Sequence, residues 1–525
     1  MTRGDTAPTA QGLRPALVLV ATSLAAFTAT LDNTVVAVAL RDIQSDLGAG
    51  VAQLQGVITA YTVALAALLL TGGTLADVAG RRRVLLAGLA VFAAASTACA
   101  LAGSAQALIA ARAVQGVGAA LVLPGGLAVL AAAYPEPGPR ARAVGIWAAT
   151  GASALVAGPV VGGLLVAASG WPAVFWVNLP LCALVALVVA FAPPGPPPSR
   201  DRRLDLPGQT LAAVGLAAGT YALVLAGRDG LGTPVALAGV TSVLALVGFV
   251  AVERRTADPV LPLALLRQRP FVGATVGAFA ASLAVFVLLV FLSLFLQLVE
   301  QRDALPSAVR LLPLTLALVV VAPFAGRWAA RRGPRPPVVL GLLLATLGMT
   351  LTGLRLQQDM PDLELALLLG LCGIGVGLTT APVVTASLDA VARTRSGLAA
   401  ASVNVARELG GVVAVAGLGA LVVARLGSDL SSRLLSLGVP AGRSQVLVEA
   451  LLRGASQNEV LRLADGQVPL DALLALRGAA QASYVSSVQV ALIGAGVVLA
   501  ISAGVCGRLL SDQSSQSRVH ELDDP

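Results

Sequence analysis

A single carboxylate, Asp32, stands in the middle of an apolar run that extends from Leu24 to Leu40. Moving a charged side chain into hydrocarbon costs at least about 3 kcal/mol, so an acid within a membrane segment is by default a candidate functional group. Its function therefore depends on whether the run crosses a membrane.

The composition indicates that it does. Hydrophobic residues make up 57% of the 525 positions and charged residues 12%, whereas soluble globular proteins carry about 25% charged residues. The net charge of +8 lies in short loops between apolar runs, so membrane topology explains it better than a nucleic-acid partner. All 35 basic residues are arginines, which suggests a GC-rich bacterial genome. We therefore expect a multi-pass protein of the bacterial plasma membrane, embedded in the lipid bilayer and without a nucleic-acid partner.

Apolar stretches long enough to cross a hydrocarbon core of about 30 Å are expected fourteen times along the chain. The predicted spans are 16–40, 51–72, 84–103, 107–132, 143–168, 173–193, 209–227, 235–252, 271–297, 308–329, 338–355, 363–388, 398–424 and 485–509. The first is about 25 residues long, so it is interpreted as a retained span and not as a signal peptide. Most arginines fall on one side if the N-terminus is inside, which predicts that both termini are cytoplasmic.

An internal repeat divides the chain. The segment GTLADVAGRRR (73–83) and the segment GRWAARRGPR (326–335) share Gly, Ala, Gly and Arg at the same spacing. The first copy follows span 2 and the second follows span 10, so two extra spans lie between two six-span halves. The fold class predicted is an all-α membrane protein. Its parts are an N-terminal six-helix bundle (1–193), two inserted helices with cytoplasmic linkers (194–270), a C-terminal six-helix bundle (271–509) that includes an outer loop (426–484), and a cytoplasmic polar tail (510–525). The outer segment is either a small folded cap or a partly ordered loop.

Four motifs carry a resemblance to a known family. They are LDNTVVAVAL (31–40), similar to LDxTVVNVALP; GTLADVAGRRR (73–83), similar to GxLaDrxGrk; RAVQGVGAA (112–120), similar to RxxqGxgaa; and ALVAGPVVGG (154–163), similar to gxxxGPxxGG. On these motifs the chain resembles the major facilitator superfamily, and within it the fourteen-span drug:proton antiporter family. The departures, Ala37, Arg41 and Val78, leave Asp32 in place.

The second motif predicts a gate. Gly73 permits close approach of a helix, Gly80 permits a turn, and Asp77 can accept from arginine side chains or a helix N-terminus. Together with Arg81 and Arg82, such a cluster could hold one conformation closed on the cytoplasmic side. The alternative is a plain positive-inside loop, which explains the arginines but not the spacing of Gly and Asp.

Arg112 and Gln115 share one helix face in the third motif. An arginine inside a span needs an acid, a carbonyl group or water as its partner; the alternative is an arginine that snorkels to the outer boundary. Helical rise places Asp32 and Arg112 about 12 Å and about 8 Å from the outer ends of their spans. The two could therefore face each other, where Arg112 would favour the charged form of Asp32 and substrate or water could reverse this. They are the predicted proton-coupling pair.

The fourth motif contains Gly158, Pro159, Gly162 and Gly163. A proline removes one backbone hydrogen bond and glycines let a neighbour pack closely, so the segment can bend or seal. Ordinary packing of small residues is the alternative. Within the superfamily that the chain resembles, this motif is associated with exporters, so the resemblance implies export.

Further polar residues within spans are candidates to line a substrate cavity: Thr28, Asn33, Gln115, Gln297, Asn404 and Arg407. Arg407 and Glu408 are adjacent, so they point in different directions and need separate partners. The alternative is a structural polar pair at the cytoplasmic third of its span. Aromatic residues make up only 4% of the chain, and no other mid-span carboxylate comparable to Asp32 is identified, so no cation-binding cage is predicted.

Cofactor sites are not expected. The four cysteines stand singly in apolar runs and the one histidine, His520, lies in the tail, so neither disulfides nor a metal site are predicted. The absence of GxxxxGK[ST] argues against an ATP-driven pump.

The function expected is that of a monomeric antiporter, not an enzyme, driven by the proton gradient. It would export amphipathic small molecules such as drugs, antibiotics or toxic metabolites by alternating access. The alternatives are an exporter of one self-made metabolite or lipid, an importer or proton-coupled sensor, and a membrane-embedded glycosyltransferase. Residues 426–483 lack the tight acidic cluster that a glycosyltransferase would need.

Overall fold

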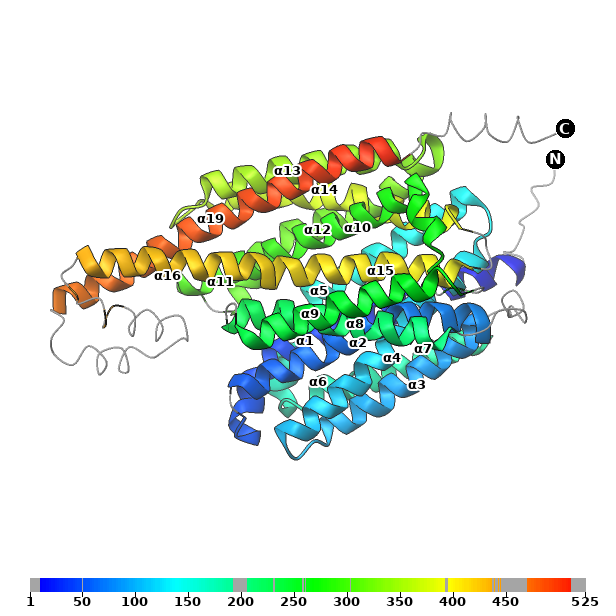
Figure 1. The fold of residues 1–525 in the computed structure, drawn as a ribbon, viewed down its shortest axis with the longest axis horizontal. Coiled ribbons are helices and arrows are strands. Elements are labelled where there is room, and N and C mark those ends of the chain that lie inside the picture. The colour runs from blue at the N-terminus through cyan, green and yellow to red at the C-terminus, as the bar shows by residue number, and fades with distance from the viewer. Residues whose placement is uncertain are drawn as a thin grey trace, which may run out of the picture.

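The computed structural model describes residues 10–49, 51–191, 205–229, 232–256, 259, 261–302, 304–391, 395–436, 439, 442, 444 and 470–510. Over these residues the chain is helical and contains no strand (Figure 1). Helices dominate because a long apolar segment in a membrane must satisfy its own backbone hydrogen bonds. The predicted all-α membrane fold is thus confirmed.

The described helices follow one another along the chain with short connections. They are α1 (Ala10–Leu47), α2 (Val51–Ala79), α3 (Arg81–Ala100), α4 (Ala105–Ala133), α5 (Pro137–Ser169), α6 (Ala173–Trp176), α7 (Asn178–Phe191), α8 (Leu206–Asp229), α9 (Thr233–Glu253), η1 (Leu263–Arg267), α10 (Arg269–Val287), η2 (Leu288–Leu292), α11 (Ser293–Leu298), α12 (Ala304–Arg332), α13 (Arg335–Arg355), α14 (Asp362–Asp389), α15 (Ser396–Val412), η4 (Val413–Gly417), α16 (Leu418–Ser436) and α19 (Leu470–Leu509).

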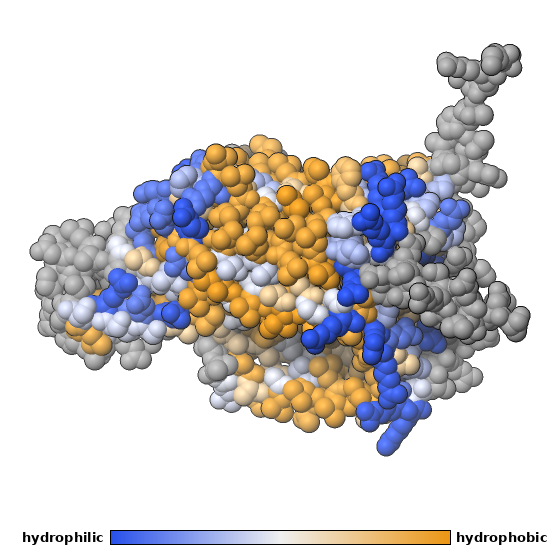
Figure 2. Space-filling view, turned by 90° about the horizontal axis from the view of Figure 1, so that it is seen from above, coloured by the Kyte–Doolittle hydropathy of each residue, from blue (hydrophilic) through white to orange (hydrophobic). Residues whose placement is uncertain are grey.

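By length and apolar composition, the described residues contain 13 helical stretches that could cross a membrane, some of them made of two or three of these helices, and 14 if the two parts of α5 count as one span. The two parts, Gly138–Leu155 and Val160–Ser169, are bent by 49° relative to each other. Apolar side chains cover the middle of the face shown in Figure 2, and hydrophilic ones lie towards its two ends. This distribution fits a multi-pass membrane protein.

The helices divide into two halves. The first half comprises α1 to α7, and the second comprises α10 to α16 with α19. They meet where α5 lies against α12 and α14, and where α15 lies against α2 and α4. Helices α8 and α9 pack on each other, and α8 also contacts α2 of the first half and α15 of the second (Figure 1). The inserted pair therefore touches both halves.

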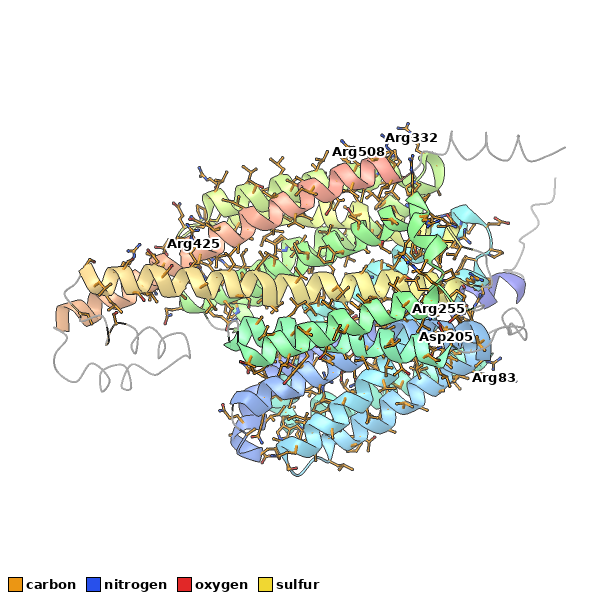
Figure 3. The ribbon with its side chains drawn as sticks, in the orientation of Figure 1. Arg83, Asp205, Arg255, Arg332, Arg425 and Arg508 are labelled. Carbon is orange, nitrogen blue, oxygen red and sulfur yellow. The ribbon has the colours of Figure 1, made fainter. Side chains whose placement is uncertain are left out.

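One end of the molecule carries many of the arginines, and we call it the arginine-rich end. Arg83, Arg255, Arg332 and Arg508 lie there, whereas Arg425 lies towards the other end (Figure 3). At this end both copies of the internal repeat make a tight turn after a helix. Gly80 and Gly333 have φ values of 99° and 82°, which glycine adopts without steric cost.

The flanks of the segment predicted as an outer loop, 426–484, are helical. Helix α16 continues to Ser436 and packs on α19, which already begins at Leu470. Val422, Leu430 and Leu434 are buried, so an apolar stripe stabilises α16 beyond its membrane-spanning part. Apart from 439, 442 and 444, the residues between these flanks lie outside the described part of the chain.

Candidate functional site

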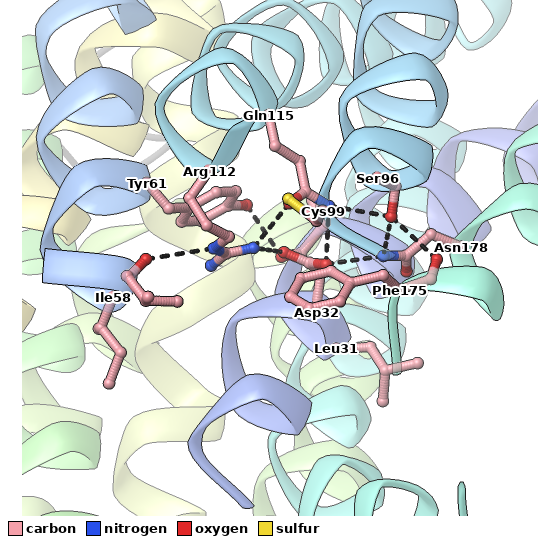
Figure 4. A network of polar contacts seen from close by, with 12 residues as sticks. Leu31, Asp32, Ile58, Tyr61, Ser96, Cys99, Arg112, Gln115, Phe175 and Asn178 are labelled. Atoms are coloured by element: carbon pink, nitrogen blue, oxygen red, sulfur yellow. Dashed lines mark hydrogen bonds and ion pairs between the residues drawn. The ribbon is translucent and has the colours of Figure 1, made fainter. Parts of the chain in front are cut away.

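The carboxylate of Asp32 lies at the centre of a buried polar network within the first half (Figure 4). Its Oδ2 accepts a hydrogen bond from Arg112 Nη1 at 2.5 Å. Its Oδ1 accepts from Gln115 Nε2 at 2.8 Å and from Asn178 Nδ2 at 2.6 Å. Helices α1, α4 and α7 thus supply one charged pair and two amides. Every oxygen of the carboxylate is hydrogen-bonded, as a buried charge requires.

Arg112 is held from several directions and is 0% exposed. Its Nε donates to the Val57 carbonyl oxygen at 3.2 Å, and its Nη1 also donates to Gln115 Oε1 at 2.8 Å. The guanidinium carbon lies 4.3 Å from the centroid of the Tyr61 ring, within range of a cation–π interaction. The alternative of a snorkelling arginine is therefore wrong, because the side chain turns inward to Asp32.

Two members of this network, Ser96 and Asn178, were not predicted from the sequence. Ser96 Oγ accepts from Asn178 Nδ2 at 3.0 Å and from Gln115 Nε2 at 3.3 Å. It donates to the Phe175 carbonyl oxygen at 2.9 Å. The available signal was weak, since each is a neutral polar residue inside an apolar run.

The structure separates the residues expected to line a cavity. Gln115 belongs to the Asp32 network instead. Thr28 Oγ1 donates to the Leu24 carbonyl oxygen at 2.8 Å, and Asn404 Nδ2 donates to that of Ala400 at 3.0 Å, so both bond to their own helices. Gln297 is half-buried and donates to Ser293 Oγ at 2.9 Å.

Asn33, Arg407 and Glu408 are each partly exposed. Glu408 lies 12 residues after the first residue of α15, which corresponds to about 18 Å along the helix. Glu408 is thus a carboxylate inside the candidate membrane span Ser396–Ser436, and it lies within the first third of that span, next to Arg407.

Asp77 connects the two halves at the arginine-rich end. Its Oδ1 accepts from the Gly397 backbone N–H at 3.0 Å, and its Oδ2 accepts from that of Leu398 at 3.1 Å. These N–H groups belong to the first turn of α15, where they have no partner within the helix. A carboxylate there also interacts favourably with the helix dipole. Arg81 Nη2 lies 3.7 Å from Asp77 Oδ1.

Gly73 lets α2 and α15 touch through their backbones. A Cβ at Gly73 would lie 2.5 Å from both the Ala401 Cβ and the Gly397 carbonyl oxygen, which is too close for any other residue. The repeat counterpart, Gly326 on α12, packs in the same way against the Ala141 carbonyl oxygen on α5. Arg82 Nη2 donates to the Ala190 carbonyl oxygen of α7, within the first half, at 2.5 Å.

A second charged contact crosses between the halves at the same end. Arg140, in the first turn of α5, forms an ion pair with Asp389 in the last turn of α14. Next to it, Gly145 packs closely against Pro323 and Ala322 of α12. The Asp77 cap, the glycine contacts and this ion pair together hold the arginine-rich ends of the two halves in contact.

The bend of α5 coincides with the motif that contains Gly158 and Pro159. Proline cannot donate the backbone hydrogen bond of a regular helix, which accounts for the bend. Gly158 lies directly against Thr34 of α1, and a Cβ at Gly162 would lie 3.3 Å from the Val35 carbonyl oxygen. A Cβ at Gly163, by contrast, would have no neighbour within 4 Å among the described residues. The motif thus places α5 against α1 directly after Asp32.

Comparisons with known proteins point to one family. The family described as Major Facilitator Superfamily matches residues 22–415. Similar sequences include the multidrug resistance protein Stp of Mycobacterium tuberculosis, 33% identical over 84% of this chain and 82% of that protein. The tetracenomycin C resistance and export protein of Streptomyces glaucescens is 32% identical over 94% and 92%. The puromycin resistance protein pur8 of Streptomyces alboniger is 37% identical over 74% and 77%.

Solved structures agree on the fold. The crystal structure of the human organic anion transporter MFSD10 (TETRAN) aligns with a TM-score of 0.60 at 15% identity, covering 94% of this chain and 99% of that chain. The proton:xylose symporter XylE aligns with a TM-score of 0.57 at 14% identity, covering 89% and 99%. At such low identity these similarities concern the fold alone.

Proposed function

Because this chain belongs to the major facilitator superfamily, we propose that it is a proton-coupled antiporter that exports amphipathic small molecules across the bacterial plasma membrane. Asp32, paired with Arg112 in the interior of a membrane-spanning bundle, is the observation that carries this proposal. The names of the relatives, which refer to multidrug resistance and to resistance against single antibiotics, support drugs or antibiotics as substrates. The protein acts as a monomer without a cofactor, and its partners are the substrate, protons and the lipid bilayer.

The proton cycle centres on the Asp32–Arg112 pair. A proton that enters from outside neutralises Asp32, and Arg112 then loses the charge that balances it. Removing the charge of one member of a buried ion pair costs about 3–5 kcal/mol, so the helices that carry the pair must rearrange. After the halves have moved, the proton leaves to the cytoplasm and the ion pair forms again. Substrate moves outward in the same cycle.

The contacts at the arginine-rich end act as the gate. By the positive-inside rule, we expect this end to face the cytoplasm. The Asp77 cap on α15 is worth about 1 kcal/mol, and the partly exposed Arg140–Asp389 pair about 0–1 kcal/mol. Contacts of this size stabilise a closed conformation without preventing it from opening in each cycle. The described conformation is then closed towards the cytoplasm.

The experiment uses everted membrane vesicles that contain the full chain and a broad panel of compounds. A proton gradient should drive accumulation of a substrate inside these vesicles, and Asp32→Asn should abolish it at an unchanged amount of protein in the membrane. Coupled export by Asp32→Asn with a normal response to the pH gradient would remove Asp32 as the coupling site. Uptake by intact cells without accumulation in everted vesicles would instead identify an importer.

A dedicated exporter of one self-made metabolite is the second candidate. It is favoured by relatives named for a single antibiotic in Streptomyces, such as the tetracenomycin C and puromycin resistance proteins. A susceptibility screen in a host that lacks its own pumps separates the two candidates. Resistance to one chemical class identifies a dedicated exporter, and resistance to several classes identifies a multidrug exporter.

A further inference from the structure

The side-chain amide of Asn178 makes uneven use of its hydrogen-bonding groups. Asn178 is the first residue of α7 and is 0% exposed. Its Nδ2 donates twice, to Asp32 Oδ1 at 2.6 Å and to Ser96 Oγ at 3.0 Å. Its Oδ1 is buried and has no hydrogen-bond partner among the described residues. Buried polar atoms in native proteins are almost always paired, so this unpaired oxygen requires an explanation.

The charge of Asp32 explains why Asn178 Oδ1 is unpaired. An ionised carboxylate can only accept hydrogen bonds, so Nδ2 of Asn178 has to face it and Oδ1 is left over. A protonated carboxyl group also carries an O–H donor, which then needs an acceptor nearby. Asn178 Oδ1, the unpaired acceptor, and the O–H donor that Asp32 gains on protonation belong to two side chains that are already in contact.

The other neighbours of Asp32 cannot supply this acceptor. Arg112 has donors only. Gln115 Oε1 already accepts from Arg112 Nη1 at 2.8 Å and from Cys99 Sγ at 3.5 Å, so turning the Gln115 amide would break these bonds. Ser96 Oγ already accepts two hydrogen bonds, from Asn178 Nδ2 at 3.0 Å and from Gln115 Nε2 at 3.3 Å. Among the described residues that bond to Asp32, only Asn178 has a free acceptor.

We propose that Asn178 is a positioning residue that follows the protonation state of Asp32, an inference that rests on the proton coupling proposed above. Its Nδ2 donates to the ionised carboxylate. When a proton binds to Asp32 Oδ1, the amide turns by half a revolution about its Cβ–Cγ bond, and its Oδ1 accepts from the new O–H group. The same turn breaks the hydrogen bonds that Nδ2 donates to Asp32 Oδ1 and to Ser96 Oγ; the O–H bond of Asp32 is the only covalent bond that forms. Asp32 can thus take up a proton without leaving its O–H donor unpaired, and α7 is coupled to the event.

Several other groups set the proton affinity of Asp32, and an Asn178 variant leaves each of them in place. Arg112 and Gln115 face it from α4, Tyr61 from α2 and Cys99 from α3. Across the boundary between the halves, α15 packs against α2 and α4 and carries Arg407 and Glu408. The elements α5 and α6, which also pack against α1, present the uncharged Ala154 carbonyl oxygen and Phe175. A change in the pH profile of an Asn178 variant can therefore be assigned to the amide.

The test combines infrared difference spectroscopy with transport in reconstituted full-length protein. A pH step protonates Asp32, and the carboxyl C=O band that disappears in Asp32→Asn is assigned to it. In Asn178→Leu, which has a similar size and no hydrogen-bonding group, this band should move to higher wavenumber because the O–H group has lost its acceptor. The midpoint of the pH profile of export should rise by about one unit, because a bond to a charged group is stronger than one to its neutral form.

Thr97→Val is the matched control, since the Thr97 hydroxyl bonds only to the Ala93 carbonyl oxygen of its own helix at 3.0 Å. It should change neither the band nor the midpoint. If Asn178→Leu does not fold, native protein labelled with ¹³C in the asparagine side-chain amide serves instead. Its isotope-shifted amide band should change on protonation, and this change should vanish in Asp32→Asn.

An unchanged Asp32 band in folded Asn178→Leu, or a labelled amide band that does not respond to the pH step, overturns the inference. The two proposals fail in different ways. If Asp32→Asn retains coupled export, Asp32 is not the coupling site, and the part of the proposed function that assigns the proton to Asp32 fails. If Asp32→Asn abolishes coupling while the Asn178 bands do not respond, only the role of Asn178 fails.

Discussion

The pair of Asp32 and Arg112 is completely enclosed by protein, and each member is the main compensation for the charge of the other. Their side chains are both 0% exposed, and the hydrogen bond between them is 2.5 Å long. Such a pair adds little net stability, because both ions lose their hydration, but removing one partner leaves an uncompensated charge. This asymmetry predicts how variants of the two residues combine.

Arg112→Leu should lower the free energy of unfolding by about 3–5 kcal/mol and abolish the response of export to the pH gradient, because Asp32 can no longer remain charged. The double variant Asp32→Asn with Arg112→Leu should be markedly more stable than Arg112→Leu alone. Thermal unfolding in detergent measures the stabilities, and everted vesicles measure export. Additive losses of stability would contradict the direct coupling of the two residues.

At this scale the sequence predicts charged groups better than neutral ones. Asp32 and Arg112 are conspicuous because a charge in an apolar run is costly, so their interpretation needed only helical spacing. Ser96 and Asn178 cost little in a helix, where serine can bond to its own backbone, and nothing in their spacing indicates that three helices bring them together.

The contact between α2 and α15 depends on the short side chain of an aspartate near the end of α2. It also depends on N–H groups at the start of α15 that have no partner within their own helix. Asp77 satisfies two N–H groups of α15, and Gly73 brings the helices close enough for it to do so. Because the Asp77 carboxylate belongs to the first half and the N–H groups of α15 belong to the second, this cap must break when the halves separate.

Asp77→Asn should slow turnover several-fold while changing the apparent affinity for substrate little. The amide carries no charge and can accept with only one oxygen, so the closed conformation loses about 1 kcal/mol. Initial rates of export over a range of substrate concentrations give kcat and KM. Asp205→Asn is the control, because Asp205 Oδ1 caps α8 within the inserted pair by accepting from the Gly208 N–H at 2.9 Å.

Equal kcat values for Asp77→Asn and the native protein would mean that this loop only determines topology. A rise in KM with unchanged kcat would place Asp77 in substrate binding instead.

Helix positions follow from hydropathy, whereas helix ends outside the membrane do not. The apolar runs predicted the membrane-spanning helices because each had to bury its backbone groups. The extension of α16 to Ser436 was missed because its residues are polar on one face and their apolar stripe is covered by α19. The bend in α5 was expected from Pro159, but the helix against which it packs could not be inferred.

The whole molecule consists of two halves joined at the arginine-rich end, with the inserted pair α8 and α9 along their side. The internal repeat predicted two equivalent halves, and Gly73 and Gly326 do pack in equivalent ways. The equivalence is incomplete, because the position that corresponds to Asp77 in the second copy is Ala330. On that side of the gate the charged contact is the Arg140–Asp389 pair.

Reversing one charge of this pair should weaken the closed conformation, and reversing both should restore it. Arg140→Asp and Asp389→Arg alone should each increase the labelling of cysteines introduced between the halves at the arginine-rich end about twofold to fivefold, since a partly exposed ion pair contributes at most about 1 kcal/mol. The double variant should return labelling to the native level.

The same reversal at Arg355 and Glu364 is a suitable control. This pair, 2.8 Å apart, joins α13 and α14 within the second half and should not affect the gate. If the double reversal at Arg140 and Asp389 labels as strongly as the single variants, the pair does not hold the halves together.

Helix α5 connects the two places where the molecule must change. Its first turn carries Arg140, which reaches the other half, and its bend rests against Thr34, two residues after Asp32 on α1. The 18 residues between Arg140 and Gly158 correspond to about 27 Å of continuous helix. We expect a shift of α1 after protonation of Asp32 to be transmitted along α5 to the Arg140–Asp389 pair, with α5 flexing at its bend.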